Sequence, residues 1–339
     1  MRRFFYLIVA VCGILFSGKA IAQDIHFSQY LQTPMLVNPG STGMFEGSHR
    51  FISNYKSQWG AMGSPYKTMA FSYDTHLFKD KLQKGNYLGL GLYAFQDAAG
   101  DSKLGQTQIN VSASGVVQLD HANSLSLGIQ GGYAKRSIST DNLRWGNQYD
   151  GSGYNASYTS MESFANTSFG YFDLSTGMVW QYRVDEKTFR DGNVFSKFDF
   201  GVAYNHLNQP RQRFMGDSER LHSKLVIHGS TEFDLRDSKY AFVASCYFIH
   251  QGTQHELVVG GAVKYYLSRM RAKYTGFGSQ SFISVGAQFR ARDSFVPTLM
   301  YEIQSFSIGL SYDYNISTLS QISKNGGLEF VLKYTLGSN

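Results

Sequence analysis

The sequence is poor in cysteine, and beyond its first residues it lacks any long apolar run. Only Cys12 and Cys246 occur in the 339 residues, and Cys12 falls in a leader that we predict to be removed. An intramolecular disulfide is therefore excluded in the mature chain, and Cys246 is expected to be a packed small side chain within the strand-like run 241–250. After the leader, no apolar stretch reaches the ~20 residues that a membrane-spanning helix needs. Helical spans are thus excluded as well.

Recognisable catalytic and metal-binding motifs are also missing. The sequence contains no G-x-S-x-G elbow, no H-E-x-x-H, no Walker loop and no Cys/His metal spacing. We therefore predict no enzyme activity, no catalytic residue, no cofactor and no metal site. An outer-membrane hydrolase is kept as a minor alternative because four histidines fall near the expected outer strand ends: His206, His222, His250 and His255.

A strong excess of one charge is absent too. The formal net charge is +6, and three of the positive charges are Arg2, Arg3 and Lys19 in the leader. The mature chain keeps a net charge of +3. Because this excess is small, nucleic acid is not expected as a partner.

Residues 1–22 have the organisation of a secretory signal peptide. Arg2 and Arg3 precede an apolar run over 4–16, and Ala20-Ile21-Ala22 fits a small-residue cleavage site. The alternative is a membrane anchor, but the apolar run is too short to span a bilayer. We predict export and cleavage near Ala22/Gln23.

What the sequence has in abundance is residue-by-residue alternation. In 125–133 the odd positions, from Leu125 to Tyr133, are mostly apolar, whereas the even positions are Ser, Gly or Gln. In 305–314 the even positions are apolar or aromatic and the odd ones are Ser, Gly or Asp. A period of two predicts strands with two different faces. There are too many such strands for the core of a soluble sandwich, so a closed barrel with an apolar outer face and a polar interior is favoured.

We predict an all-β outer-membrane β-barrel of about fourteen antiparallel strands over residues 49–339, undivided by any linker. The predicted strands are 49–58, 66–76, 86–95, 106–118, 124–135, 168–182, 197–206, 222–234, 239–249, 256–268, 280–290, 296–302, 305–314 and 327–336. With a periplasmic N-terminus, the long polar connections 136–167 and 207–221 would lie outside the cell. The connections 183–196 and 269–279 would lie inside and are candidate docking elements.

Residues 23–48 do not alternate, and Pro34, Pro39 and Gly40 favour an irregular path. We expect this lead-in segment to fill the lumen as a plug or to lie at the periplasmic rim as a surface for a partner. Pro39 favours an extended conformation at Asn38, so 38–40 predicts a turn. Phe27 and Tyr30 are expected to anchor that turn in the barrel mouth.

Several linked blocks stand in the first half of the chain, and one stands near its end. They are His26-Phe27-Ser28-Gln29-Tyr30, Asn38-Pro39-Gly40, Asn54-Tyr55-Lys56-Ser57-Gln58-Trp59, Ser72-Tyr73-Asp74 and Gly327-Leu328-Glu329-Phe330. With these blocks the chain resembles the PorP/SprF family, which are outer-membrane barrel proteins of the type IX secretion system.

The resemblance implies a fourteen-stranded barrel that carries out no covalent chemistry. It also implies partners: the periplasmic ring and lipoprotein components of the secretion machine, or the C-terminal domain of one secreted adhesin of the gliding-motility type. Outer-membrane lipids would surround the barrel. The residues that the resemblance assigns to partner binding or to the plug are His26, Phe27, Ser28, Gln29, Tyr30, Asn38, Pro39, Asn54, Gln58, Trp59, Tyr73 and Asp74. A porin-like solute channel is the alternative function.

The side chains of the predicted strands can be assigned to faces. Trp59 and Tyr73 are expected in interfacial aromatic girdles, and Asp74 is expected to face the lumen or the periplasm. A network of paired charges is predicted to line the lumen, although such a lining could instead grip a polypeptide or filter ions. Its candidate members are Lys197, Asp199, Lys224, His228, Glu232, Asp234, Glu256, Lys264 and Arg290.

Overall fold

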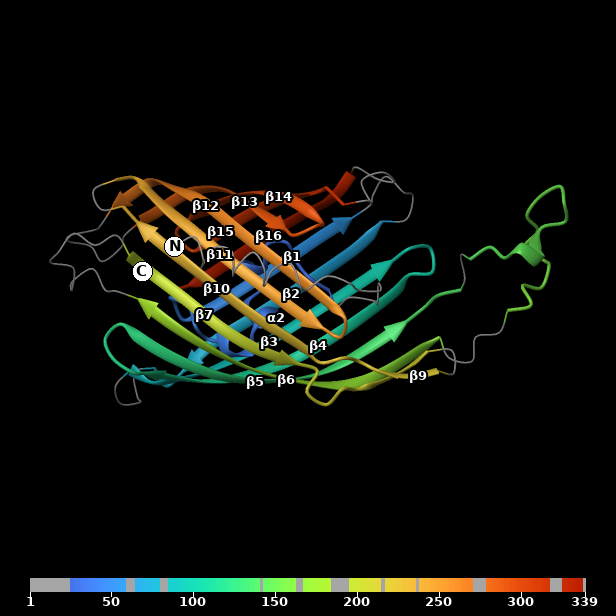
Figure 1. The fold of residues 1–339 in the computed structure, drawn as a ribbon, viewed down its shortest axis with the longest axis horizontal. Helices are drawn as coiled ribbons and strands as arrows, with labels where there is room; N and C mark the ends of the chain where they lie inside the picture. The colour runs from blue at the N-terminus through green and yellow to red at the C-terminus, as the bar shows by residue number, and fades with distance from the viewer. Residues whose placement is uncertain are drawn as a thin grey trace, which may run out of the picture.

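The computed structural model describes residues 25–58, 65–79, 85–140, 143–162, 167–183, 195–214, 217–235, 238–270, 279–317 and 325–337. Within these residues the chain forms a closed barrel of fourteen antiparallel strands, seen from the side in Figure 1. No helix in this part of the chain is long and apolar enough to cross a membrane. The predicted fold class is confirmed. The predicted signal peptide lies outside the described residues.

Each barrel strand pairs with its neighbours in the sequence, and β1 pairs with β16 to close the ring. The barrel strands are β1 (His49–Gln58), β2 (Tyr66–Leu77), β3 (Tyr87–Ala99), β4 (Leu104–Gln118), β5 (Asn123–Ser137), β6 (Ser168–Arg183), β7 (Phe195–Asn205), β10 (Lys224–Asp234), β11 (Tyr240–Gln251), β12 (Gln254–Met270), β13 (Ser279–Arg290), β14 (Ser294–Ile303), β15 (Phe306–Asn315) and β16 (Asn325–Leu336). We call the end where β1 begins and β16 ends the near end, and the opposite end the far end.

The far end carries a small hairpin that the sequence analysis missed. Residues 207–221 were predicted to be a plain connection, but they contain β8 (Arg211–Phe214) and β9 (Asp217–Arg220), which pair with each other. The hairpin is tied to the barrel because the guanidinium of Arg136 donates a hydrogen bond of 3.0 Å to the side chain of Gln212. Two strands of four residues are too short and too polar to show a period of two.

The alternation of the sequence becomes the two faces of the barrel wall. Along β15, Phe306, Ile308 and Leu310 are exposed on the outer face, while Ser307 and Ser311 are buried toward the lumen. Exposed apolar side chains suit an outer surface that contacts hydrocarbon. Cys246 lies on this outer face and is exposed, so the expectation of a packed side chain was wrong. The alternation of β11 turns even-numbered residues outward at this position.

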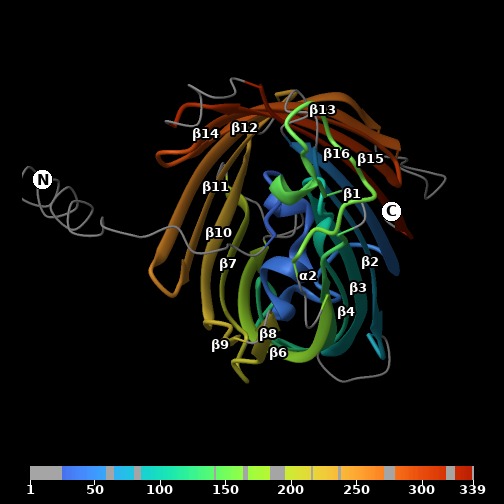
Figure 2. The same ribbon diagram turned by 90° about the vertical axis from the view of Figure 1, so that its right-hand side faces the viewer.

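The lead-in segment lies inside the barrel, where Figure 2 shows it within the ring of strands. We call residues 25–48 the plug. Its short helical turns are η1 (Tyr30–Gln32), α2 (Pro34–Val37) and η2 (Pro39–Ser41). The η2 turn packs against β4, β5, β6 and β7, so the plug leans on one half of the wall and leaves space beside the other half.

Candidate functional site

The plug crosses the lumen with its first residues, and β15 and β16 hold it there. The backbone N–H groups of Ser28 and Gln29 donate to the Glu329 carboxylate at 2.7 and 3.0 Å. The Ser28 hydroxyl donates to Asp313 at 2.6 Å. Hydrogen bonds to an ionised acceptor are stronger than neutral ones. These contacts therefore fix the plug to the last two strands of the barrel.

Two cations complete this cluster. The Nζ of Lys56 lies 3.3 Å from a carboxylate oxygen of Asp313, and both side chains are only 2% exposed. The Arg290 guanidinium lies 3.3 Å from Glu256 and 3.6 Å from Asp313, and it donates to the Ser28 hydroxyl at 3.2 Å. Buried charges persist only when they are paired and hydrogen-bonded. The plug thus supplies hydrogen-bonding partners to the charged side chains of this cluster.

Two aromatic side chains anchor the plug on opposite walls. The Tyr30 ring stacks on Tyr247 of β11, with ring centroids 4.7 Å apart. Phe27 packs instead with Met35 of the plug and with Tyr93 on β3. Both anchors lie inside the lumen rather than at the barrel mouth, which corrects the position expected from the sequence. Burial raises the pKa of the Tyr30 hydroxyl, so this group stays protonated.

The predicted turn at Asn38 and Pro39 forms in the middle of the plug. Asn38 has an extended backbone and caps η2, because its Oδ1 accepts a hydrogen bond of 2.8 Å from the Gly40 N–H. Its Nδ2 donates to the Met178 carbonyl of β6 at 3.0 Å and lies 3.0 Å from Nε2 of His228 on β10. One fully buried amide therefore joins the plug to two strands.

Glycines on the inner wall make room for the plug backbone. A Cβ at Gly128 would overlap the Pro39 carbonyl and would lie 2.5 Å from the Gly40 nitrogen. A Cβ at Gly89 would overlap the Thr42 carbonyl in the same way. Absence of a side chain allows the close approach of two backbones. The wall is therefore shaped for this segment.

Asp74 binds the plug where it leaves the barrel at the near end. Its carboxylate accepts a hydrogen bond of 2.8 Å from the Gly43 N–H. Arg50 binds both oxygens of the same carboxylate, at 2.9 and 2.6 Å. The bidentate geometry is strong and directional. Gly43 has φ +73°, a left-handed conformation that favours glycine.

The remaining predicted site residues are more scattered. His26 lies 3.9 Å from Glu256, and Asn54 is buried in β1. Gln58 is at the far end of β1, opposite Gly327. Trp59 lies outside the described residues.

Tyr73 faces outward, away from the plug. Its ring lies 4.8 Å from Phe51, and its hydroxyl lies 3.0 Å from Nδ1 of His49. Tyr334 and Phe306 continue this aromatic group around the near end, with ring centroids 4.6 Å apart. Such a group suits a membrane interface, where one end of each ring is apolar and the other meets water.

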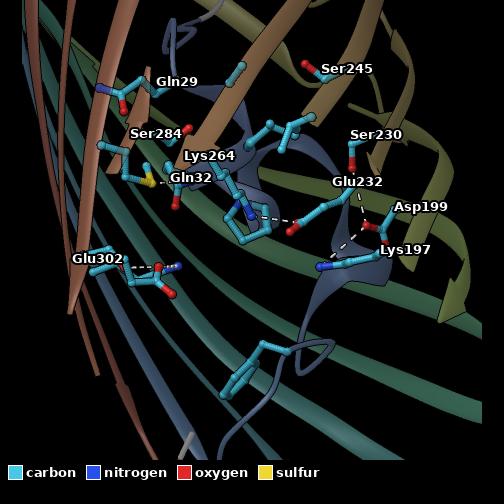
Figure 3. Close-up of a pocket in the computed structure, with 18 of the residues that line it drawn as sticks. Gln29, Gln32, Lys197, Asp199, Ser230, Glu232, Ser245, Lys264, Ser284 and Glu302 are labelled. Atoms are coloured by element: carbon cyan, nitrogen blue, oxygen red, sulfur yellow. Dashed lines mark hydrogen bonds and ion pairs between the residues drawn. The ribbon is translucent and has the colours of Figure 1, made fainter. Parts of the chain in front are cut away.

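A cavity of 640 Å³ remains between the plug and the wall formed by β6, β7 and β10 to β16 (Figure 3). The plug residues Gln29, Tyr30 and Gln32 bound it toward the far end, and Ser305 lines it at the near-end rim. Four ion pairs line its walls among the described residues: Lys264–Glu232 at 2.7 Å, Arg183–Glu46 at 2.7 Å, Lys333–Glu302 at 3.1 Å and Lys197–Asp199 at 3.8 Å. The cavity thus offers a surface on which paired charges alternate with apolar side chains, and it opens at the near end.

Several residues that hold the plug were not assigned to the site from the sequence, although Lys56 and Glu329 stand in the quoted motif blocks. Lys56, Asp313 and Glu329 form its main attachment, yet they stand in three different strands. A signal was present, since Asp313 and Glu329 fall on the inward, small-residue faces of strands that otherwise alternate with apolar residues. A charge at such a position requires a partner inside the barrel. No group of three or more His, Cys, Asp or Glu side chains able to hold a metal ion occurs in the part of the chain that the structure describes.

The chain matches the model of one protein family over most of its length. The family described as "Type IX secretion system membrane protein PorP/SprF" matches residues 20–334. No protein of curated function matches the chain.

Solved structures of other barrels are similar at low identity. The toluene transporter TbuX of Ralstonia pickettii has 11% identity and a TM-score of 0.48, over 89% of this chain and 92% of that one. The CymD monoaromatic hydrocarbon channel has 8% identity and a TM-score of 0.45, over 91% and 94%. The translocator domain of the autotransporter NalP from Neisseria meningitidis has 9% identity and a TM-score of 0.36, over 91% and 95%. At these values nothing about function is transferred.

Proposed function

The chain belongs to the PorP/SprF family of type IX secretion system membrane proteins, and on that basis we propose that it binds protein partners and does not conduct solutes. Its partners are the periplasmic ring and lipoprotein components of the secretion machine, the C-terminal domain of a secreted adhesin of the gliding-motility type, or both. The adhesin would be exported or retained at the surface with its help. The observation that carries the proposal is the plug bound across the lumen.

The lengths of the connections support an orientation. The two longest, 138–167 and 206–223, both lie at the far end. Long extracellular loops and shorter periplasmic turns are the usual arrangement in outer-membrane barrels. The near end, with the plug exit and the cavity, then faces the periplasm. The candidate docking connections 183–196 and 269–279 belong to this end, but most of their residues lie outside the described ones.

The plug favours partner binding over a porin-like channel. Residues 27–30 reach from the wall near Tyr93 to the opposite wall at Tyr247, and they are hydrogen-bonded to Glu329 on the way. A solute would have to break these buried contacts to pass. The hydrolase alternative gains no support from His206, which pairs with Asp173 at 2.9 Å inside the wall.

The cavity is the surface that we propose for a periplasmic partner. Its volume falls in the range of ~300–1,000 Å³ that is usual for binding pockets. Its Lys–carboxylate pairs are able to exchange partners with the mixed charges and backbone groups of a polypeptide. A segment of the secretion machinery or of the adhesin would therefore enter from the near end.

The proposal is tested by affinity isolation of the tagged mature protein after cross-linking, in cells that make the type IX system. We expect the wild type to recover defined secretion components or the adhesin. The variant Glu232→Met/Lys264→Met removes one cavity pair together and should reduce recovery severalfold. The control Lys264→Arg keeps the charge and should recover as much as the wild type. Recovery of none of these proteins, together with steady conductance in planar bilayers, would favour the channel instead.

A further inference from the structure

Residues 143–162, which we call the aromatic loop, stand away from the far end of the barrel (Figure 1). Eleven of these twenty residues are Tyr, Ser, Gly or Asn, and Trp145 and Arg144 are also present. The plug, the cavity and the near end do not involve this segment. Its composition is far from that of a neutral spacer, because large aromatic rings are placed among small polar residues.

The aromatic loop is ordered by its own hydrogen bonds. Gln148 is buried at its centre, accepting from the Trp145 N–H and donating to the Tyr158 carbonyl, each at 3.1 Å. The Asn155 N–H donates to the Gln148 carbonyl at 2.8 Å. Tyr149 and Tyr154 form an isolated antiparallel bridge. The segment is thus held in one conformation without support from a partner.

A tight turn closes this bridge. The carboxylate of Asp150 accepts from the backbone N–H groups of Ser152 and Gly153, both at 2.9 Å. The Ser152 hydroxyl, followed by these backbone donors, lowers the pKa of Asp150. The one carboxylate at the tip is therefore used in holding the turn.

Large side chains of the aromatic loop nevertheless face solvent. The exposed fractions are 53% for Tyr149, 36% for Tyr154, 45% for Tyr158 and 80% for Met161. At this distance from the barrel they contact water and not hydrocarbon. A cluster of exposed apolar groups on an ordered element indicates an interaction site.

Charge does not dominate this surface. The Arg144 guanidinium lies over the Tyr154 ring, 4.9 Å from its centroid, and Asp150 is engaged in the turn. The Tyr149 and Tyr154 rings are tilted by 59° to each other, so they do not form one flat platform for a planar ligand. The uneven surface of a protein is more complementary to two rings tilted in this way than a planar ligand is.

We propose that the aromatic loop is the surface by which this barrel holds an exported protein on the extracellular side; this rests on the proposed function. Antibody paratopes use the same residue types, because Tyr and Trp give a large contact area at low entropic cost while Ser, Gly and Asn adapt their hydrogen bonds. Preorganisation lowers the cost of binding further. The partner is a folded protein recognised through shape, apolar contact and neutral hydrogen bonds.

The test separates retention from export. In cells that make the type IX system, deletion of the gene first identifies the exported proteins that are lost from the cell surface. The variant Tyr149→Ser/Tyr154→Ser/Tyr158→Ser then removes the exposed rings, and Ala156→Ser/Thr159→Ser in the same loop keeps them as a control. Heat-modifiable migration on gels confirms that each barrel is folded.

We expect the triple variant to lower the surface-bound amount of those proteins at least about tenfold, which is the effect of losing one interface hot spot. The medium should gain the missing protein, since export continues. The control should retain wild-type amounts, and raising NaCl should not release the protein, because exposed ion pairs are not involved. Full retention by the triple variant would overturn the inference while leaving the proposed function intact. If gene deletion alters no exported protein, both fail.

Discussion

At the scale of single residues, Lys56 is a charged side chain that is buried inside the barrel. It is buried with Asp313 and donates to the plug through the Ser28 hydroxyl at 3.1 Å. The carboxylate of Glu329, also fully buried, accepts from the plug nearby. A lysine in this position offsets carboxylates that could not remain ionised alone.

Replacement of Lys56 by Met should therefore destabilise the barrel by roughly 3–5 kcal/mol, the cost of leaving buried carboxylates without their cation. The double variant Lys56→Met/Asp313→Asn removes both charges and should recover a large part of that loss. Urea unfolding of the refolded proteins in lipid vesicles, followed by tryptophan fluorescence, measures both. Equal stability of the single and double variants would contradict the pairing.

The outer face can be tested by a single charge. Leu127 is 62% exposed on the outer face of β5, so Leu127→Arg should cost roughly 2–4 kcal/mol if it lies near the bilayer midplane. Thr298→Arg is the matched control, because Thr298 faces the cavity and an arginine there remains in water. The same unfolding assay compares the two. Equal tolerance of both would show that the faces are assigned wrongly.

At the scale of elements, the strands could be predicted from the sequence because a period of two is a strong signal where two solvents differ. β1 spans the predicted 49–58, and β15 differs from its prediction by one residue at each end. The turn at Asn38 could be predicted from Pro39, but the helix α2 could not, since it has four residues and no periodicity.

The candidate site was only half predictable. Its motif residues Ser28, Asn38 and Asp74 were marked, but Glu329 lies 301 residues away from Ser28. Nothing local in the sequence links two such residues, because only the closure of the ring brings β16 beside the plug.

The close approach of the plug backbone to the wall glycines can be tested at this scale. Gly128→Ala should displace the Pro39 turn and cost about 1–3 kcal/mol, as overpacking does, and it should expose residues 25–48 to added protease. Gly115→Ala on the neighbouring β4 meets no atom within 4 Å and should leave the plug protected. Limited proteolysis with N-terminal sequencing reads out both. Protection of the plug in both variants would exclude the close approach as the reason for glycine.

At the scale of the whole molecule, we expect the lumen not to conduct ions. The wild-type protein in planar bilayers is expected to show no steady conductance, because residues 27–30 cross the lumen. A variant lacking residues 25–46 should conduct, since it loses the crossing segment and keeps the polar wall. Single-channel recording compares the two. Identical conductance of both proteins would mean that the plug does not seal the barrel.

The attachment of the plug has a consequence for how the cylinder is completed. Lys56 belongs to the first strand and Glu329 to the last, and these two strands meet along one seam. Ser28 contacts both residues, so the first residues of the plug bridge the seam along which the ring closes. A ring closed without the plug would lose the hydrogen bonds that Glu329 accepts from the Ser28 and Gln29 N–H groups, and Lys56 would lose its bonds to Ser28 and to the His26 carbonyl. Insertion of the plug and closure of the seam therefore stabilise each other.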